Sequence, residues 1–420
     1  QAVFVAAGLS KLITARPDSP AHRECHLVVR TDTAHPAITA VLGLPWELLR
    51  DPSNILTQGN RPAQVWRSLP GGGEAFLPAP PPLRILAIHP RPDTESTGHS
   101  DYRRHTLPLL EAVGIFGKLM ELRVLVPPTL AALEKQLNDS WATGQPFTAL
   151  HLDASLRNDM PGNTILLGFE ASHEPPSPPY RQAHFVAATI LASLLATYRV
   201  RLVVLSAGTD DAERSATVGL ASTLLAAGIA AVVTLHPDTP AVTQRRFWTT
   251  FYEELLHGTR ISQALFAGQS RLAGDSYRGL GLGGNVHLQD WFCYNLYLGE
   301  RDPRLCLRPP SELWHRSLKR ARTRSSDRLP PTPSTGFVGR SRDLLRVERL
   351  LAEQPTLFLR GPGGSGKTTT AIALADWLAR GGRFRHIAYV NGDDASAPRT
   401  LLETLGQQLL HQGKHWSTDL

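Results

Sequence analysis

The sequence predicts an α/β protein built around a mainly parallel sheet, followed by the start of a second α/β domain. Short apolar runs rich in Val, Ile and Leu alternate with amphipathic stretches of helical length over most of the chain. Strands and helices that alternate at this spacing form parallel sheets covered by helices. Near residue 314 the composition becomes basic and then proline-rich, and a glycine-rich segment between an apolar run and an amphipathic stretch lies beyond it. These shifts predict two domains joined by a linker.

Length and composition agree with this organisation. The chain has 420 residues, 42% of them apolar and 19% charged, which is typical of a globular protein of two domains. Three dispersed cysteines favour a reducing compartment over a disulfide framework, so we expect a cytoplasmic protein. The net charge is +7, and part of it lies in a run from Arg316 to Arg328. That run lacks interleaved aromatic residues, so a solvated linker is favoured over a nucleic-acid contact.

The elements of the first domain follow in chain order. Strands are predicted at 24–30, 83–89, 122–127, 147–153, 163–169 and 201–207, and helices at 107–119, 129–139, 184–198 and 241–258. The stretch "VGLASTLLAAGIAAVVTL", 218–235, resembles a membrane span in length and apolarity. Gly228 falls where a helix would end, and a β-branched run follows it. A helix and a buried strand therefore explain the stretch better, and no membrane contact is expected.

The glycine-rich segment beyond the linker carries the most specific motif. The stretch "PTLFLRGPGGSGKTTTAIALADWLA" is an apolar strand, a G-x-x-x-x-G-K-T loop and an amphipathic helix, which is the context of a P-loop. Backbone amides and the helix N-terminus would hold phosphate oxygens, Lys367 would reach the β- and γ-phosphates, and the Thr368 hydroxyl would hold Mg²⁺. We predict binding of ATP or ADP with Mg²⁺. The predicted contacts are Gly361, Gly363, Gly364, Ser365, Gly366, Lys367, Thr368 and Thr369.

The segment upstream of this loop, "FVGRSRDLLRVERLLA", resembles the one that precedes the P-loop in STAND-type NTPases such as the NB-ARC and NACHT proteins. The resemblance covers 335–420 and implies that Gly339 and Arg340 also contact the nucleotide. The Walker B acidic residues of that family have no counterpart here. "HIAYVNGDD" is better explained as an intervening strand than as Walker B, so the resemblance implies that the NTPase continues beyond Leu420 and leaves hydrolysis undecided.

A second glycine motif is set aside. "GLGLGG", Gly279 to Gly284, matches G-x-G-x-x-G but neither follows a predicted strand nor opens a helix. A flexible loop explains it better than a dinucleotide site.

Several segments of the first domain together resemble the CHAT domain, a caspase-like peptidase family often fused to TPR repeats or STAND NTPases. The resemblance covers nearly all of 20–300 and implies a caspase-like α/β sandwich. The segments are "LGLPWELLRDP", "LRILAIH", "LVPPTLAALEKQL", "LHLDAS", "VVLSAG", "FYEELLHGTRISQALFAGQSRL" and "DWFCYNLYLG".

Active members of that family carry a His-Gly pair after one strand and a cysteine after another. The chemistry needs a thiolate as nucleophile and an imidazole as its base. Here Ser155 and Leu156 fall at the His-Gly pair, and Gly208 falls at the cysteine. We therefore expect no catalytic residues. Displaced substitutes stay open as alternatives, namely His151, Ser155, Cys25, Cys293 or Cys306.

Together these observations predict a CHAT-like pseudo-peptidase at 1–310, a basic Pro/Ser-rich linker at 311–334, and the N-terminal part of a STAND-type NTPase at 335–420. We expect a nucleotide-regulated signalling or defence switch, in which the first domain binds a protein partner such as an active CHAT relative or an effector. Nucleotide-dependent self-association is also expected. The alternative is an active CHAT-type peptidase with displaced catalytic residues.

Overall fold

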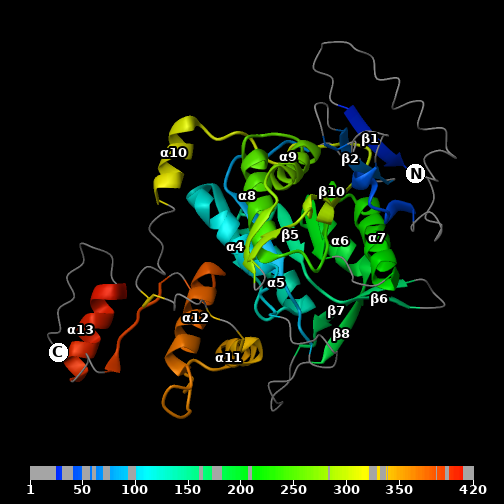
Figure 1. Cartoon of the computed structure of the whole chain (residues 1–420). Helices are drawn as coiled ribbons and strands as arrows, with labels where there is room; N and C mark the ends of the chain where they lie inside the picture. Colours follow the sequence, from blue (N-terminus) through cyan, green and yellow to red (C-terminus); the bar gives the residue numbers. More distant parts are fainter. Residues whose placement is uncertain are drawn as a thin grey trace.

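A central sheet organises the computed structural model (Figure 1). The structure describes residues 25–30, 41–49, 57–58, 63–69, 76–92, 101–159, 164–172, 182–206, 211–281, 284–320, 329–331, 337, 339–384, 386–392 and 397–409. Within them the sheet has eight strands in the order β1-β2-β13-β10-β9-β5-β3-β4. The strands are β1 (Cys25–Arg30), β2 (Ala63–Ser68), β3 (Leu83–Ile88), β4 (Met120–Val124), β5 (Ala149–Leu152), β9 (Leu202–Ser206), β10 (Ala231–Leu235) and β13 (Tyr294–Leu298).

The sheet is mainly parallel, as the sequence predicts. Neighbouring strands pair in parallel everywhere except between β10 and β13, which are antiparallel. Long apolar runs such as β10, in which every residue is buried, are typical of parallel strands covered on both faces. The arrangement is a mixed α/β fold consistent with a caspase-like architecture.

Helices cover both faces of this sheet. Residues of α4 (Thr106–Val113), α8 (Ala241–Leu256) and α9 (Ile261–Gly274) share one buried cluster with one face of the strands. Residues of α5 (Leu130–Ala142), α6 (Ala188–Thr197) and α7 (Asp211–Ala226) share a second cluster with the other face. Along β9, Leu202 and Val204 belong to the first cluster and Val203 and Leu205 to the second, because successive side chains of a strand point to opposite faces.

Several predicted elements differ from the structure. The helix predicted at 184–198 begins as strand β8 (Ala183–Ala187), where β-branched and aromatic residues pair with β7 (Thr164–Glu170). With β6 (Leu156–Asp159) these strands form a separate antiparallel sheet, so the strand predicted at 163–169 is not part of the central one. The helix predicted at 107–119 ends at Val113 and continues as the 3₁₀ segment η2 (Gly114–Leu119).

The apolar stretch at 218–235 is divided as predicted. Helix α7 ends at Ala226, Gly228 adopts a left-handed φ of +100°, and β10 follows. None of the described helices has the length and apolarity to span a membrane.

The "GLGLGG" segment is a hairpin, not the flexible loop predicted. Strands β11 (Tyr277–Gly281) and β12 (Gly284–His287) pair antiparallel. Arg278, in β11 itself, is 7% exposed and donates to Asp290 Oδ1 at 2.6 Å, and that buried ion pair holds the start of the hairpin.

The first part of the predicted linker is also ordered. Residues 311–320 form α10 (Ser311–Arg320), which packs against η2. Trp314 stacks on His257 with ring centroids 4.6 Å apart. The remaining basic residues of the run, 321–328, lie outside the described residues.

The C-terminal part contributes α11 (Ser341–Glu353), α12 (Lys367–Arg380) and α13 (Pro398–Leu409). The strands predicted before the P-loop and at "HIAYVN" are not formed, because no described strand lies beside either segment to supply ladder hydrogen bonds. Phe358, in the first of these segments, is 80% exposed.

Candidate functional site

The carboxyl ends of two neighbouring strands define the site predicted in the first domain. Strands β5 and β9 pair in parallel, with Leu152 opposite Leu205, so the segments that follow them begin at the same edge of the sheet. In α/β sheets this edge is where working side chains gather. Ser155 lies three residues beyond β5. Gly208 lies just beyond β9, outside the described residues.

Ser155 faces the small antiparallel sheet. Its carbonyl accepts the backbone N–H of Gly168 in β7 at 3.0 Å. Its Oγ is buried and has no hydrogen-bond partner among the described residues. A Cβ on Gly168 would meet that Oγ at less than 3.0 Å, so the serine fills its space tightly. A hydroxyl held in this way has no base beside it in the described part of the chain.

His151 points into the helical layer. Its Nε2 lies 2.5 Å from the Tyr252 hydroxyl of α8, and its ring packs edge-on against Trp248 with centroids 4.8 Å apart. Burial lowers the pKa of His151 from 6.5 to about 3, because the protonated ring would lose its hydration. A neutral imidazole bonded to a tyrosine acts here as a packing residue.

A polar cluster that the sequence analysis missed lies at the same edge. Arg91, after β3, forms an ion pair with Asp153, after β5. Burial alone would raise the pKa of Asp153, but Arg91 and His105 outweigh it and lower that pKa. His105 Nδ1 lies 3.2 Å from Gln244 Oε1, and burial lowers the pKa of that histidine too. The aspartate is thus held ionised by a charge partner.

A comparison with known protein families agrees with this strand order and with these strand ends. Residues 105–300 match the CHAT domain family. The match shows a caspase-like, peptidase-related module that includes β5, β9 and Ser155. No curated protein matches the chain closely.

The described thiols in and just beyond the CHAT-matched segment are Cys293, which is half-buried, and Cys306, which is buried. Burial raises the pKa of Cys293 to about 11 and that of Cys306 to about 11. A thiol with so high a pKa is a poor nucleophile near neutral pH, since only the thiolate attacks. The side chain of Cys25 in β1 lies outside the described residues.

The P-loop residues lie together at the start of α12. Gly364 and Gly366 adopt left-handed φ values of +72° and +78°, which turn the loop above the helix N-terminus. Lys367 curls back, and its Nζ donates to the carbonyls of Gly361 at 3.0 Å and Pro362 at 2.8 Å. The Thr368 side chain is exposed. The loop is therefore accessible, with its lysine already directed over it.

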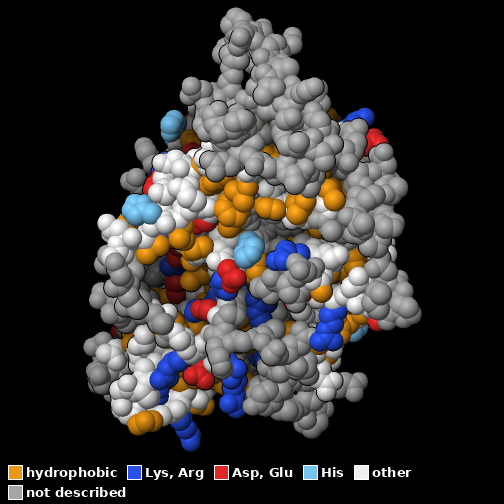
Figure 2. Space-filling model, turned by 45° about the vertical axis from the view of Figure 1, so that its right-hand side comes forward, with side chains coloured by type: hydrophobic (Ala, Val, Ile, Leu, Met, Phe, Trp, Pro, Cys, Tyr) orange, Lys and Arg blue, Asp and Glu red, His pale blue; other side chains and the backbone are white. Residues whose placement is uncertain are grey.

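Arg340 lies beside this loop. A Cβ on Gly366 would lie 3.8 Å from its Cζ and 3.9 Å from its Nη2. Gly339 and Arg340 adopt left-handed φ values of 77° and 53°, which place the guanidinium at the start of α11. Basic side chains gather low on the face in Figure 2, at the height of α11 and α12 in Figure 1. Asp393 and Asp394, the last two residues of the "HIAYVNGDD" segment, lie outside the described residues.

Proposed function

We propose that the chain is a nucleotide-regulated signalling or defence switch, in which a CHAT-like domain without peptidase activity binds a protein partner. A STAND-type, ATP-binding NTPase segment at 335–420 supplies the regulation. The observation that carries the proposal is the position of the P-loop. It opens α12, whose Leu374, Trp377 and Leu378 belong to the same buried cluster as one face of the CHAT-matched sheet. A change at the loop can therefore reach the first domain.

The residues of the loop fit a nucleotide with Mg²⁺. Exposed amides at the start of α12 would bind phosphate oxygens, and Lys367 would exchange its two loop carbonyls for the β- and γ-phosphates. Thr368 would hold Mg²⁺, which neutralises phosphate charge when bound. Arg340 adds a positive charge on the other side of Gly366.

The absence of peptidase chemistry is supported by the strand ends. Ser155 replaces the base that the CHAT resemblance implies, and Gly208 replaces the nucleophile. The displaced candidates in the described residues are poorly suited to take over, because His151 is neutral and bonded to Tyr252 and because burial raises the pKa of the Cys293 and Cys306 thiols. The domain would then act through its surface, on an active CHAT relative, an effector or another copy of the chain, in the cytoplasm.

The first experiment measures ATP·Mg²⁺ binding by titration calorimetry. Charge-assisted hydrogen bonds contribute about 1.5–3 kcal/mol, so Lys367→Ala should weaken binding by roughly 10- to 150-fold. Lys135→Ala is the matched control, because that lysine is exposed on α5 and pairs with the surface residue Asp139. Equal affinity of Lys367→Ala and the parent would overturn the nucleotide site.

A second experiment addresses the peptidase. Mass spectrometry would search for new peptide termini in a lysate and in the protein itself, with ATP and Mg²⁺ present. We expect none. Cleavage that disappears in Ser155→Ala, with circular dichroism confirming that the variant folds, would overturn the pseudo-peptidase interpretation.

A further inference from the structure

The outer edge of strand β4 is covered by the end of the P-loop helix. Strand β4 is the last strand in the sheet order, so no strand among the described residues lies beside its outer edge. There the Val124 N–H donates to the Gly381 carbonyl at 2.9 Å, just after α12 ends. A Cβ on Gly382 would lie 3.4 Å from the Leu122 carbonyl. A free strand edge is a ready template for pairing with another chain, and here a helix end covers it.

A buried glutamate joins α11, α12 and the segment before α4. Glu348 is 2% exposed and accepts hydrogen bonds from the Tyr102 hydroxyl at 2.7 Å and from Trp377 Nε1 at 3.2 Å. Trp377 packs edge-on against Tyr102 with ring centroids 5.8 Å apart. Burying a carboxyl group is costly unless its oxygens are bonded, so these contacts hold the three elements in one arrangement.

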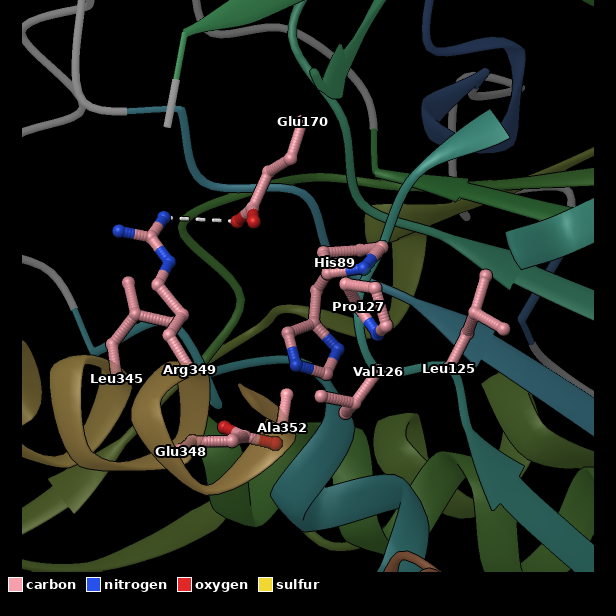
Figure 3. Close-up of a pocket in the computed structure, with 10 residues that line it drawn as sticks. His89, Leu125, Val126, Pro127, Glu170, Leu345, Glu348, Arg349 and Ala352 are labelled. Atoms are coloured by element: carbon pink, nitrogen blue, oxygen red, sulfur yellow. Dashed lines mark hydrogen bonds and ion pairs between the residues drawn. The ribbon is translucent and has the colours of Figure 1, made fainter. Parts of the chain in front are cut away.

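The neighbouring arginine continues the contact to the carboxyl edge of the sheet. Arg349 donates to the Arg91 carbonyl at 2.6 Å and to Glu170 Oε1 at 2.9 Å. Glu170 is 1% exposed. Figure 3 shows this ion pair above His89, in a small pocket between α11 and the strand ends. Arg91 in turn pairs with Asp153, two residues before Ser155. The helix is thus connected to the site in the CHAT-matched segment.

Both helices also begin at the P-loop. Helix α12 starts at Lys367 itself, and Arg340, the N-cap of α11, lies beside Gly366. Helix α12 has 14 residues and is therefore about 21 Å long, with the loop at one end and the β4 edge at the other. A rigid helix transmits a displacement of one end to the other.

We propose that α11 and α12 form a releasable latch over the β4 edge, held by Glu348, Arg349, Trp377 and Gly381, and that nucleotide binding at the P-loop changes how firmly it closes. The coupling to nucleotide rests on the proposed function; the latch itself does not. Opening would expose the Met120–Val124 edge and release the Arg91 carbonyl from Arg349.

The test is hydrogen–deuterium exchange of the full chain, read at β4 and at the buried strand β9. Arg349→Ala removes one side of the buried ion pair with Glu170, so exchange at 120–124 should become at least tenfold faster while β9 stays protected. Arg346→Ala is the matched control, because Arg346 is an exposed arginine on the same helix. Unchanged exchange at β4 in Arg349→Ala, or equal loosening of β9, would overturn the latch.

The nucleotide arm adds ATP·Mg²⁺ to the parent and to Lys367→Ala. Coupling predicts that ATP alters exchange at 120–124 in the parent and has no effect in Lys367→Ala. Protection at 361–369 without any change at β4 would overturn the coupling and leave nucleotide binding intact. No protection at either place would overturn the proposed function and the coupling with it, and the Arg349→Ala comparison would still decide the latch.

Discussion

Arg67 in β2 offers a quantitative test of whether the N-terminal segment belongs to the same folded unit as the CHAT-matched residues. Arg67 and Glu47 form an ion pair in which both side chains are 0% exposed. The guanidinium also donates to the carbonyls of Leu42 at 3.1 Å and Leu44 at 2.7 Å. Removing one partner of such a pair leaves a buried charge and costs about 3–5 kcal/mol. For a domain of this size that lowers Tm by roughly 6–20 °C.

The assay is thermal unfolding of Arg67→Met followed by far-ultraviolet circular dichroism. Replacing both partners, as in Arg67→Met with Glu47→Leu, should restore most of the stability, because no unpaired charge remains. Arg84→Met is the control, since Arg84 pairs with the exposed Glu121 and that contact contributes about 0–1 kcal/mol. Equal Tm values for Arg67→Met and Arg84→Met would contradict this prediction and would mean that the segment around β2 does not share the main unfolding transition.

Three further predictions concern the CHAT-matched module and its edges. Gly168→Ala should lower the free energy of unfolding, measured by chemical denaturation, by about 1–3 kcal/mol. The loss should be smaller in a Ser155→Ala background, because the clashing Ser155 Oγ is then absent. Additive effects of the two substitutions would contradict this contact. The pKa of His151 is about 3 in the folded state against 6.5 in the unfolded state, so the free energy of unfolding should fall as pH drops from 6.5 toward 3, by at most about 1.4 kcal/mol per pH unit. His151→Gln should therefore flatten the slope of Tm against pH. An unchanged slope would refute this assignment of the histidine. Cys293 and Cys306, with pKa values of about 11, should alkylate with iodoacetamide at pH 8 far more slowly than a free peptide thiol, which mass spectrometry can follow.

The central strands could be predicted because each is a continuous apolar run. Strands β3, β9 and β10 are buried on both faces and carry their signal locally. Strand β2 was missed, since "AQVWRS" contains polar residues whose burial depends on distant partners such as Glu47. The sequence predicts a helix at strand β8, because the pairing with β7 that makes it a strand cannot be read from the segment itself.

The candidate sites could be predicted to different degrees. The P-loop motif carries the glycines and the lysine that form the loop and open the helix, so both could be predicted from the sequence. The strand expected before the loop depends on neighbours that the described residues lack, and it was not formed. The ion pair between Arg91 and Asp153 joins residues 62 positions apart, so no local sequence pattern predicts it. The position of Ser155 in the chain was visible, but its tight contact with Gly168 was not.

That contact bears on how the chain could change over evolutionary time. An imidazole is several atoms larger than the hydroxymethyl group of Ser155, and Gly168 leaves no room even for one added methyl. A lone Ser155→His change would therefore force β7 outward and cost stability. The side chain at 155 and the residue at 168 share one space, so we expect substitutions at the two positions to occur together.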